Sequence, residues 1–332
     1  MKVVVAPDSF KGTYTALQVA TAIGRGLAQT PAVPVLVPVA DGGEGTVAVL
    51  AEPLGLRHRA VPARNPWGAE CEGTVALAPS GAAYIELAQV CGINAPHEGS
   101  RDPVTADTYG VGMLMADAAR QGATEIVVAA GGSATSDGGF GALRAIEERG
   151  GLRGTPVTVL TDVTTPYAEA ARVFGPQKGA DAGQAAALTL RLHHRARLLR
   201  RDPTYVPRTG AAGGFAGAMW AQFEAELVSG ADYVLNALSF DDRLADAEAV
   251  VVGEGRLDVQ SSQGKIVSAV LARSAGIACF AVAGSVGADL GPLRGEFMEI
   301  IVASDEAAME AAGRAIGQRL RVRQGTGRQA LG

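Results

Sequence analysis

The chain has 332 residues, of which 48% are hydrophobic and 19% charged, and its formal net charge is −5. That length predicts about two domains, and the apolar content is sufficient for buried sheets covered by helices. The negative charge and an aromatic content of only 5% argue against a nucleic-acid partner, which requires a basic surface and base-stacking platforms. No apolar run reaches transmembrane length, so we expect no membrane partner.

The cysteines and histidines exclude two further classes. The three cysteines form no CxxC pair and the four histidines have no metal-ligand spacing, so neither a disulfide framework nor a zinc site is indicated. The sequence starts directly on a strand pattern, without an apolar signal segment. We therefore expect a cytoplasmic protein.

The first elements alternate between strand and helix patterns. An apolar run at 2–7 ends at a proline, and a helical stripe follows at 15–27. A second strand at 33–41 and a second helix at 44–52 repeat this order. Such a βαβα opening predicts a parallel sheet.

The pattern changes between residues 59 and 88, where short alternating runs are separated by Pro-Trp-Gly and Pro-Ser-Gly turns. These runs predict antiparallel strands and the start of a second domain. Beyond them we predict helices at 108–122, 184–201 and 265–276, a glycine loop leading into a helix at 210–223, and strands at 125–130, 155–163, 247–255, 278–284 and 298–304. A last helix is predicted after Ser304, with Ser304 as its N-cap, and the tail from Gln324 is expected to be loose.

Several predicted strands end in glycine and carboxylate residues. The motifs are PDSFKG at 7–12, DGGEG at 41–45, GGSATSDGG at 131–139, TD at 161–162, and GEG at 253–255 with Asp258 close behind. In open α/β sheets, ligands bind beyond the carboxyl ends of the strands. Glycine-rich loops can bind phosphate through backbone N–H groups, and carboxylates can hold Mg²⁺ or accept a proton. These motifs are typical of phosphoryl transfer, whereas hydride transfer is disfavoured because no GxGxxG follows the first strand.

Lysine is rare in this sequence, because only four of the 29 basic residues are lysines. Three of them, Lys11, Lys178 and Lys265, directly adjoin a glycine. The compact ammonium group of lysine suits phosphate. Their placement favours phosphate contacts, although chance placement of three surface lysines is the alternative.

Each motif alone also has a purely structural explanation. Asp8, Asp41 and Asp137 could cap the helices that follow them, and the GEG at 253–255 could be a tight turn. The sequence has no Walker loop, no protein-kinase signature and no GxSxG motif. Their absence disfavours a standard NTPase and a serine hydrolase.

Six motifs in series resemble the bacterial glycerate kinase family, which phosphorylates D-glycerate with ATP, generally to 2-phosphoglycerate. They are APDSFKGTYTA at 6–16, ADGGEGT at 40–46, GGSATSDGG at 131–139, FGPQKGA at 174–180, GAAGG at 210–214 and GEGRLD at 253–258. The resemblance implies two α/β domains. A mixed-sheet domain at 60–276 would be inserted into a Rossmann- or flavodoxin-like parallel-sheet domain at 1–59 and 277–332, with the active site in the cleft. It also implies ATP and Mg²⁺ as cofactors.

The sequence departs from the family pattern at a few places. Ser136 stands where the family usually has asparagine, TDVTTPY replaces a cysteine-containing motif at 161–167, and Val259 and Ser261 vary another. These changes keep the charges and glycines. The connection at 148–156 is much shorter than usual, and this could alter a lid or an oligomer contact.

We assign roles to the matched residues from their chemistry. The catalytic residues are Asp8, Lys11, Asp162 and Lys178, with Asp8 or Asp162 as the base. The glycerate carboxylate would be bound by Lys11 together with Ser9, Arg64, Arg256 and Lys265. The phosphates would be bound by Gly131, Gly132, Ser133, Gly138, Gly139, Gly213 and Gly214. The candidate Mg²⁺ ligands are Asp41, Glu44, Asp137, Asp162, Glu254 and Asp258.

The expected partner is the small-molecule substrate D-glycerate, and the protein would be a monomer or a homodimer. Two alternatives remain open at this stage. One is a kinase for another small hydroxy acid, and the other is a non-catalytic small-ligand-binding regulator of α/β type.

Overall fold

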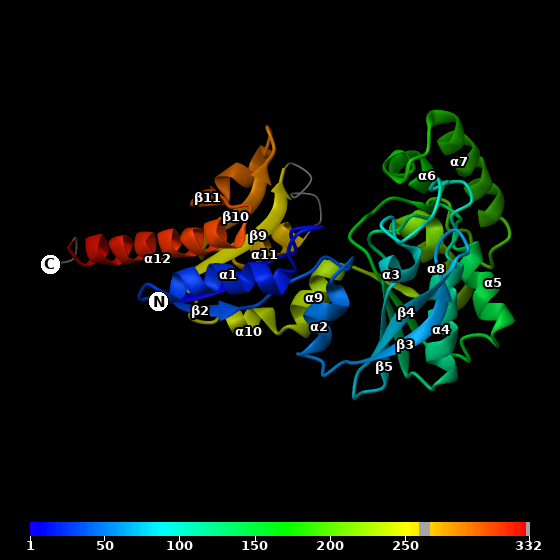
Figure 1. Ribbon diagram of the computed structural model, residues 1–332, viewed down its shortest axis with the longest axis horizontal. Helices are drawn as coiled ribbons and strands as arrows, with labels where there is room; N and C mark the ends of the chain where they lie inside the picture. The colour runs from blue at the N-terminus through cyan, green and yellow to red at the C-terminus, as the bar shows by residue number, and fades with distance from the viewer. Residues whose placement is uncertain (259–265, 330–332) are drawn as a thin grey trace. The chain divides into compact units, whose positions relative to one another are not determined.

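The computed structural model describes residues 1–258 and 266–329, and it divides into two compact units (Figure 1). Unit 1 combines Met1–Asp41 with Val234–Gly332, and unit 2 is Gly42–Tyr233. The α/β architecture expected from the sequence, a mixed-sheet insertion in a parallel-sheet domain, is confirmed. Within the described residues, no helix has the length and apolar character that a membrane span requires.

Unit 1 is built on a five-stranded, fully parallel sheet in the order β11-β10-β9-β1-β2. Its strands are β1 (Lys2–Pro7), β2 (Val33–Leu36), β9 (Ala249–Leu257), β10 (Ala278–Val286) and β11 (Glu299–Val302). Its helices are α1 (Ala16–Ala28), α10 (Phe240–Leu244), α11 (Ile266–Arg273) and α12 (Glu306–Gln329), with a 3₁₀ turn at Gly291–Gly295, and α9 (Gly230–Ala237) connects the two units.

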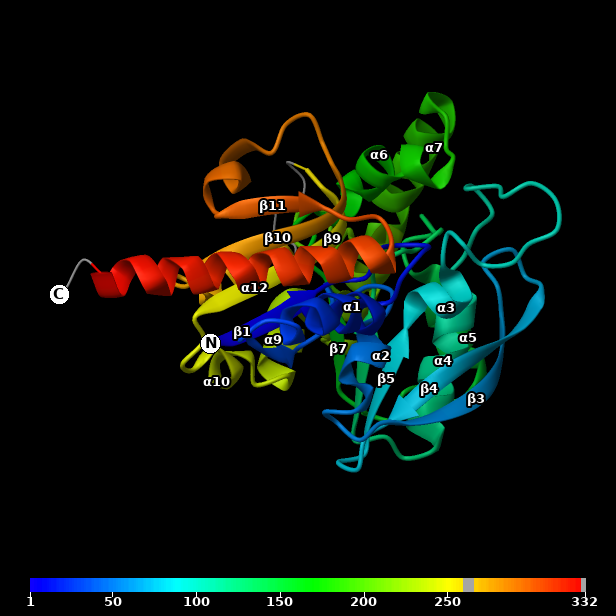
Figure 2. The same ribbon diagram turned by 60° about the vertical axis from the view of Figure 1, so that its left-hand side comes forward.

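Helices α1 and α12 cover one face of this sheet, as Figure 2 shows. Helix α1 begins with a capping box, in which Thr15 and Gln18 each bind the other's backbone N–H. Its apolar stripe, including Val19 and Ile23, packs with Met309 of α12 and with alternate residues of the strands. Helix α11 contacts β9 and contributes the buried Val267 and Val270. The parallel sheet is therefore enclosed, as its continuous apolar strands require.

Unit 2 contains a six-stranded mixed sheet in the order β3-β4-β5-β6-β7-β8. Its strands are β3 (Arg57–Arg64), β4 (Glu70–Leu77), β5 (Ala82–Glu86), β6 (Glu125–Ala129), β7 (Val157–Leu160) and β8 (Glu226–Val228). Strands β3 to β5 are antiparallel, whereas β5 to β8 pair in parallel. The carboxyl ends of β5, β6, β7 and β8 therefore lie at the same edge of the sheet.

Most helices of unit 2 belong to one of two cores. The helices of this unit are α2 (Thr46–Ala51), α3 (Leu87–Cys91), α4 (Tyr109–Arg120), α5 (Phe140–Glu148), α6 (Ala170–Phe174), α7 (Ala182–Ala196) and α8 (Phe215–Phe223), with 3₁₀ turns at Tyr167–Glu169, Pro176–Lys178 and Ala211–Gly214. Helix α2 contacts β5. Helices α3, α4, α5 and α8 pack with the sheet in one core. The segment containing α6 and α7 has a small core of its own around Tyr167, Leu188 and Leu192.

The two units differ from the domain boundaries near 59 and 276 that the sequence suggested. Strand β9 pairs with β1 and β10, so it belongs to the parallel sheet and not to the insertion. Residues 42–59 pack with unit 2. A single buried strand pattern does not reveal which sheet the strand joins, and this explains the difference.

Other differences concern individual elements. The N-cap expected at Ser304 is contributed by Asp305, whose Oδ1 accepts the backbone N–H of Ala308 at 2.8 Å. Helix α12 continues to Gln329, beyond the point where a loose tail was expected. The second strand ends at Leu36, earlier than expected. Helices α9 and α10 were not predicted, because their short apolar runs have no clear helical period.

Candidate active site

The carboxyl ends of β1 and β9 form one wall of a cavity of about 510 Å³ in unit 1. The two strands pair in parallel with Pro7 opposite Gly253, so the segments that follow these residues run together along the cavity. Gly284, Ser285 and Ser304 line another part of it. Six of the residues predicted from the sequence line this cavity: Asp8, Ser9, Lys11, Glu254, Arg256 and Asp258.

Asp8 is buried on the cavity wall, with 8% of its surface exposed. Its Oδ1 accepts the backbone N–H of Ser9 at 2.6 Å. Burial and the nearby charge of Asp41 together raise the pKa of the Asp8 carboxyl to about 7, while the hydrogen bond from Ser9 and the charge of Lys11 oppose the shift. A carboxyl with a pKa near neutrality can exchange a proton with a bound hydroxyl group.

The GEG motif lies inside β9 and not in a tight turn. A Cβ on Gly255 would come within 3.2 Å of the Phe10 Cα, and a Cβ on Gly284 would come within 2.7 Å of the Gly255 carbonyl oxygen. These glycines allow β9, β10 and the segment after β1 to approach closely. The close approach brings Glu254 and Asp8 to the same cavity.

The basic residues assigned to glycerate binding lie in different environments. Lys11 lines the cavity. The Arg256 side chain is 70% exposed and its Nε lies 3.3 Å from Oδ2 of Asp258. Lys265 lies outside the described residues.

In unit 2, the loop 131–139 connects β6 to α5, and most of it is buried. Gly132 is exposed and has a φ of +78°, a conformation that favours glycine. Gly131 donates its backbone N–H to the Gly42 carbonyl at 3.3 Å, and a Cβ on Gly131 would lie 2.6 Å from the Gly43 Cα. Two glycine motifs distant in sequence therefore pack backbone against backbone.

Asp137 is bound as a helix cap. Its Oδ2 accepts hydrogen bonds from the Thr108 N–H at 3.0 Å, the Thr108 hydroxyl at 2.8 Å and the Gly141 N–H at 2.8 Å. Its Oδ1 accepts the Gly139 N–H at 3.1 Å. Four donors occupy the carboxylate at the start of α5, so this arrangement favours the capping interpretation over a role as an Mg²⁺ ligand.

The four glycines at 138–139 and 213–214 are buried where two loops meet. Gly138 donates its N–H to the Gly213 carbonyl at 2.9 Å. A Cβ on Gly213 would lie 2.0 Å from the Thr135 carbonyl oxygen, and one on Gly139 would lie 2.5 Å from the Ala218 Cβ. Close packing explains these glycines, so the part of the loop open to a phosphate is Gly131–Gly132, with Ser133 largely buried beside it.

Lys178 points into this loop from the turn before α7 and is also buried. Its Nζ donates to the Ser133 hydroxyl at 2.9 Å and to the Thr135 carbonyl at 2.5 Å. Burial lowers the pKa of the Lys178 ammonium to about 7, and Asp137 opposes the shift. The side chain therefore supports the loop from its buried side.

Asp162 lies at the end of β7 and is bound to the first turn of α9. Its Oδ1 accepts the Ser229 hydroxyl at 2.9 Å and its Oδ2 accepts the Ala231 N–H at 3.1 Å. These contacts are those of a helix cap. Glu44, another candidate metal ligand, is exposed on unit 2.

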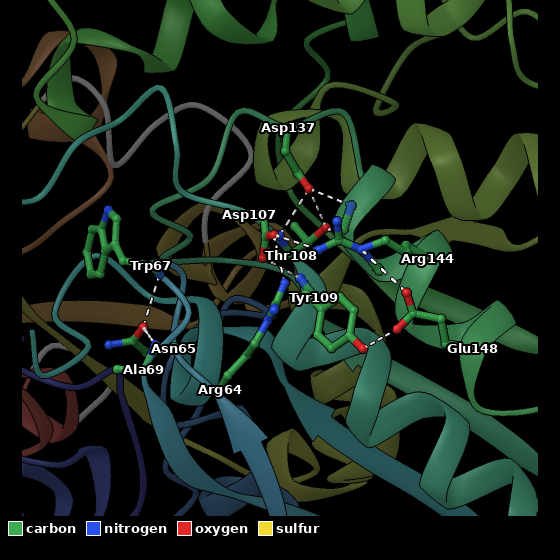
Figure 3. A network of polar contacts seen from close by, with 12 residues as sticks. Arg64, Asn65, Trp67, Ala69, Asp107, Thr108, Tyr109, Asp137, Arg144 and Glu148 are labelled. Carbon is green, nitrogen blue, oxygen red and sulfur yellow. Dashed lines mark hydrogen bonds and ion pairs between the residues drawn. The ribbon is translucent and has the colours of Figure 1, made fainter.

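Arg64 belongs to a polar network at the start of α4 (Figure 3). Its Nη2 lies 3.0 Å from Oδ2 of Asp107, and its guanidinium carbon lies 3.5 Å from the centre of the Tyr109 ring. Arg144 contacts the same carboxylate at 3.5 Å. With these contacts, Arg64 reads as part of the packing of unit 2 and not as a ligand for glycerate.

Glu86 is a buried carboxyl that the sequence reasoning missed. It ends β5, and its Oε1 accepts the Val47 N–H at 2.7 Å near the start of α2. Burial raises the pKa of the Glu86 carboxyl. The sequence did contain an indication of this site, because Glu86 stands at the end of an apolar strand, as the candidate site carboxylates do.

No group of three or more acidic, histidine or cysteine side chains is arranged as a metal site in residues 1–258 and 266–329. Three carboxylates do influence one another in unit 1, since Asp41 and Glu254 both raise the pKa of Asp8. Mg²⁺ in kinases commonly takes one or two protein carboxylates and completes its shell with water and phosphate oxygens. Two of these carboxylates, Asp41 and Glu254, would suffice for that mode of binding.

The chain is similar to known glycerate kinases over most of its length. A family model described as the glycerate kinase family matches residues 3–151 and 146–320. The chain is 36% identical over 333 residues to glycerate 2-kinase of Escherichia coli, covering 88% of this chain and 87% of that one. It is 35% identical over 327 residues to glycerate kinase of Halalkalibacterium halodurans, covering 86% of each. A crystal structure from Salmonella typhimurium LT2, assigned as a glycerate kinase 2, superimposes with a TM-score of 0.81 at 29% identity, covering 98% of this chain and 99% of that one.

Proposed function

Since this chain belongs to the glycerate kinase family, we propose that it transfers the γ-phosphoryl group of ATP to D-glycerate and forms 2-phosphoglycerate. The observation that carries the proposal is the cavity of unit 1, where the buried Asp8, with a pKa near 7, lies beside Lys11 and Glu254. The kinase family implies ATP as the donor. The hydroxyl group and the carboxylate of D-glycerate match the carboxyl and ammonium groups of the cavity.

In the proposed reaction, a hydroxyl oxygen of D-glycerate forms a bond to the γ-phosphorus, and the bond from that phosphorus to the β-phosphate oxygen breaks. The hydroxyl proton passes to the carboxylate of Asp8, and ADP leaves. Asp8 is preferred over Asp162 as the base, because both oxygens of Asp162 accept hydrogen bonds at the start of α9. Proton acceptance by a positioned base contributes typically about 10²- to 10⁴-fold to a rate.

The substrate carboxylate would be bound by the basic side of the same cavity. Lys11 and Ser9 line it together with Arg256. The ammonium of Lys11 would also balance charge on the transferred group. Because Arg256 is 70% exposed and contacts Asp258 through Nε, its other guanidinium nitrogens can bind an anion while that contact is kept.

Mg²⁺ would be held in unit 1 by Glu254 and Asp41, with phosphate oxygens and water completing its shell. When bound, it would neutralise negative charge on the phosphates during transfer. Asp258 is already paired with Arg256, and Asp137 and Asp162 act as caps in unit 2. We therefore assign none of these three to the metal.

In unit 2, the Gly131–Gly132 segment, with Gly132 exposed and Gly131 half-buried, is the candidate phosphate-binding edge. The N–H groups of Gly132 and Ser133 donate to no protein acceptor in the described part of the chain. Undonated N–H groups in a glycine turn can bind an anion. Lys178 then acts on phosphate only through the loop that it supports.

A coupled ADP-release assay tests the proposal. D-Glycerate, L-glycerate, tartronate and several sugar acids would be offered with ATP and Mg²⁺, and the product of the best acceptor would be identified by NMR. We expect the highest kcat/KM for D-glycerate and a phosphate on the 2-hydroxyl. A higher kcat/KM for a different hydroxy acid would favour the alternative acceptor, and no ADP release with any acceptor would refute a kinase function.

The variant Asp8→Asn should lower kcat by roughly 10²-fold or more, whereas Asp242→Asn should leave it unchanged. Asp242 is an exposed aspartate on α10 of the same unit, so it controls for the loss of one charge. Equal turnover of the two variants would remove Asp8 from the mechanism.

A further inference from the structure

Four consecutive carbonyl groups of the loop 131–139 each accept a hydrogen bond from a side chain. The Thr135 carbonyl accepts from Lys178 at 2.5 Å, and the Ser136 carbonyl accepts from Arg191 Nη2 at 3.1 Å. The next two acceptors are the Asp137 carbonyl, bound by Arg195 Nη1, and the Gly138 carbonyl, bound by the Tyr167 hydroxyl at 2.9 Å. We call these four donors, Tyr167, Lys178, Arg191 and Arg195, the carbonyl clamp.

All four donors come from one small segment of unit 2, between the 3₁₀ turn that starts at Tyr167 and the end of α7 (Figure 1). Arg191 and Arg195 are four residues apart and so project from the same face of α7. Buried Tyr167, Leu188 and Leu192 form a core for this segment that is separate from the main core of unit 2. The clamp is thus carried by a packed helical platform and not by the strands of the sheet.

The clamp residues also contact the neighbours of the loop. Arg191 Nη1 donates to the Val104 carbonyl at 2.8 Å, and the Arg195 guanidinium carbon lies 4.8 Å from the centre of the Phe140 ring. Lys178 adds its bond to the Ser133 hydroxyl at 2.9 Å. Lys178 therefore contacts both Thr135, inside the buried half of the loop, and Ser133, which adjoins the exposed Gly132.

We propose that the carbonyl clamp positions the loop 131–139 for nucleotide binding, so that Tyr167, Lys178, Arg191 and Arg195 are positioning residues. The inference rests on the proposed role of Gly131–Gly132 in binding the phosphates of ATP. The reason is geometric. A peptide carbonyl and the N–H of the following residue point in opposite directions, so the four bound carbonyls fix the N–H groups of residues 136–139. The bond from Lys178 to the Ser133 hydroxyl extends this support to the residue next to Gly132.

The charges of the clamp support this interpretation. A buried or half-buried cation is costly unless it is hydrogen-bonded. Lys178 is buried, Arg191 and Arg195 are half-buried, and all three donate to neutral carbonyl groups. Asp137 raises the pKa values of Lys178 and Arg191, and Asp102 also raises that of Arg191, but four donors already occupy the Asp137 oxygens. Hydrogen bonds from charged donors are roughly twice as strong as neutral ones, and they polarise the peptide groups they bind.

Single substitutions in the clamp test the inference. Arg195→Met removes the donor to the Asp137 carbonyl, Arg195→Lys keeps one donor, and Tyr167→Phe removes only a hydroxyl group. Arg197→Met is the matched control, because Arg197 is exposed one residue beyond α7 and its side chain makes no hydrogen bond within the described residues. The measurements are KM for ATP, KM for D-glycerate, kcat, affinity for MgADP, and hydrogen exchange of the peptide 131–141.

We expect Arg195→Met to raise KM for ATP and weaken MgADP binding by roughly tenfold or more, with KM for D-glycerate within about twofold of wild type. Exchange of the peptide 131–141 should become faster. Arg195→Lys should recover most of the affinity, and Tyr167→Phe should give a smaller change of the same kind. Arg197→Met should behave as wild type.

Several results would refute the proposed positioning role of the carbonyl clamp. One is an Arg195→Met variant that matches Arg197→Met in affinity and exchange. Another is an equal rise in both KM values with no recovery in Arg195→Lys, which indicates a general loss of structure. A wild-type protein that binds MgADP but turns over no acceptor would refute the proposed function, while the affinity and exchange data would still decide on the clamp. Failure of the wild type to bind MgADP would refute both.

Discussion

Replacing Asp137 distinguishes a helix cap from a metal ligand. In Asp137→Ala, the N–H groups of Thr108, Gly139 and Gly141 lose their acceptor in a site where Asp137 is only 3% exposed. An unsatisfied buried donor costs about 1–3 kcal/mol. Water entering the space left by the carboxylate would satisfy part of the set. We therefore expect the free energy of unfolding of unit 2 to fall by about 3–5 kcal/mol.

Urea unfolding followed by tryptophan fluorescence measures this loss. The only two tryptophans, Trp67 and Trp220, both lie in unit 2, so the signal reports on that unit. The experiment is done in EDTA without nucleotide and repeated with MgADP. Asp137→Asn serves as the second variant. It can keep the oxygen that faces Thr108 and Gly141, and we expect it to lose roughly half as much stability.

The result that refutes the capping interpretation is specific. In that case Asp137→Ala would unfold at the wild-type urea concentration in EDTA but would gain no stability from MgADP. A metal ligand contributes only when the metal is bound, whereas a cap contributes in either condition.

Three further predictions concern single residues. Because the pKa of Asp8 is raised from 3.8 to about 7, kcat/KM should rise as pH increases through about 7, and Asp8→Asn should remove that dependence. The Asp8 carboxyl holds its proton more tightly in the folded state than in the unfolded state, so the free energy of unfolding of the wild type should fall as the pH rises from 4 to 7. Above pH 7, Asp8→Asn should have a higher thermal unfolding midpoint than the wild type. Gly213→Ala should destabilise unit 2 by about 1–3 kcal/mol in the tryptophan assay, because its Cβ would lie 2.0 Å from the Thr135 carbonyl oxygen. Gly179→Ala is the control for the positive φ, because Gly179 has a φ of +92° and open space around it. Asp162→Asn should keep its stability within about 0.5 kcal/mol, because asparagine caps helices as well as aspartate does, and should retain most of its turnover; a large loss of kcat would return Asp162 to the mechanism.

The grouping of residues in unit 1 could be predicted from the sequence. Asp8 and Glu254 each lie at the end of an apolar, β-branched run, and parallel strands bring their carboxyl ends to one edge of a sheet. The strand patterns therefore implied that the two carboxylates share a site. The capping box of α1 also depends only on nearby residues, because Thr15 and Gln18 are three residues apart.

The rest depends on contacts between distant segments. Asp137 was known to lie before a helix, but Thr108, which supplies two of its four donors, comes from 29 residues earlier. Lys178 looked like a phosphate ligand because it adjoins glycine, and only the packing of the segment around α6 and α7 turns it toward the Thr135 carbonyl. A pattern in one segment shows the conformation of that segment but not its partner.

The strand order of unit 1 has a consequence for folding during synthesis. Strand β1 leaves the ribosome before unit 2, yet Val3 pairs with Ala249 of β9, which follows the whole of unit 2. Helix α1 also lacks a packing partner at that stage, because the backbone of Gly26 packs against Glu310 of α12. Unit 2 is continuous and can fold as soon as it has emerged, since domains generally fold as units. Part of the apolar surface of β1 and α1 therefore stays uncovered until β9 and α12 have been synthesised, and through these two elements the nascent protein is exposed to chaperones and to aggregation.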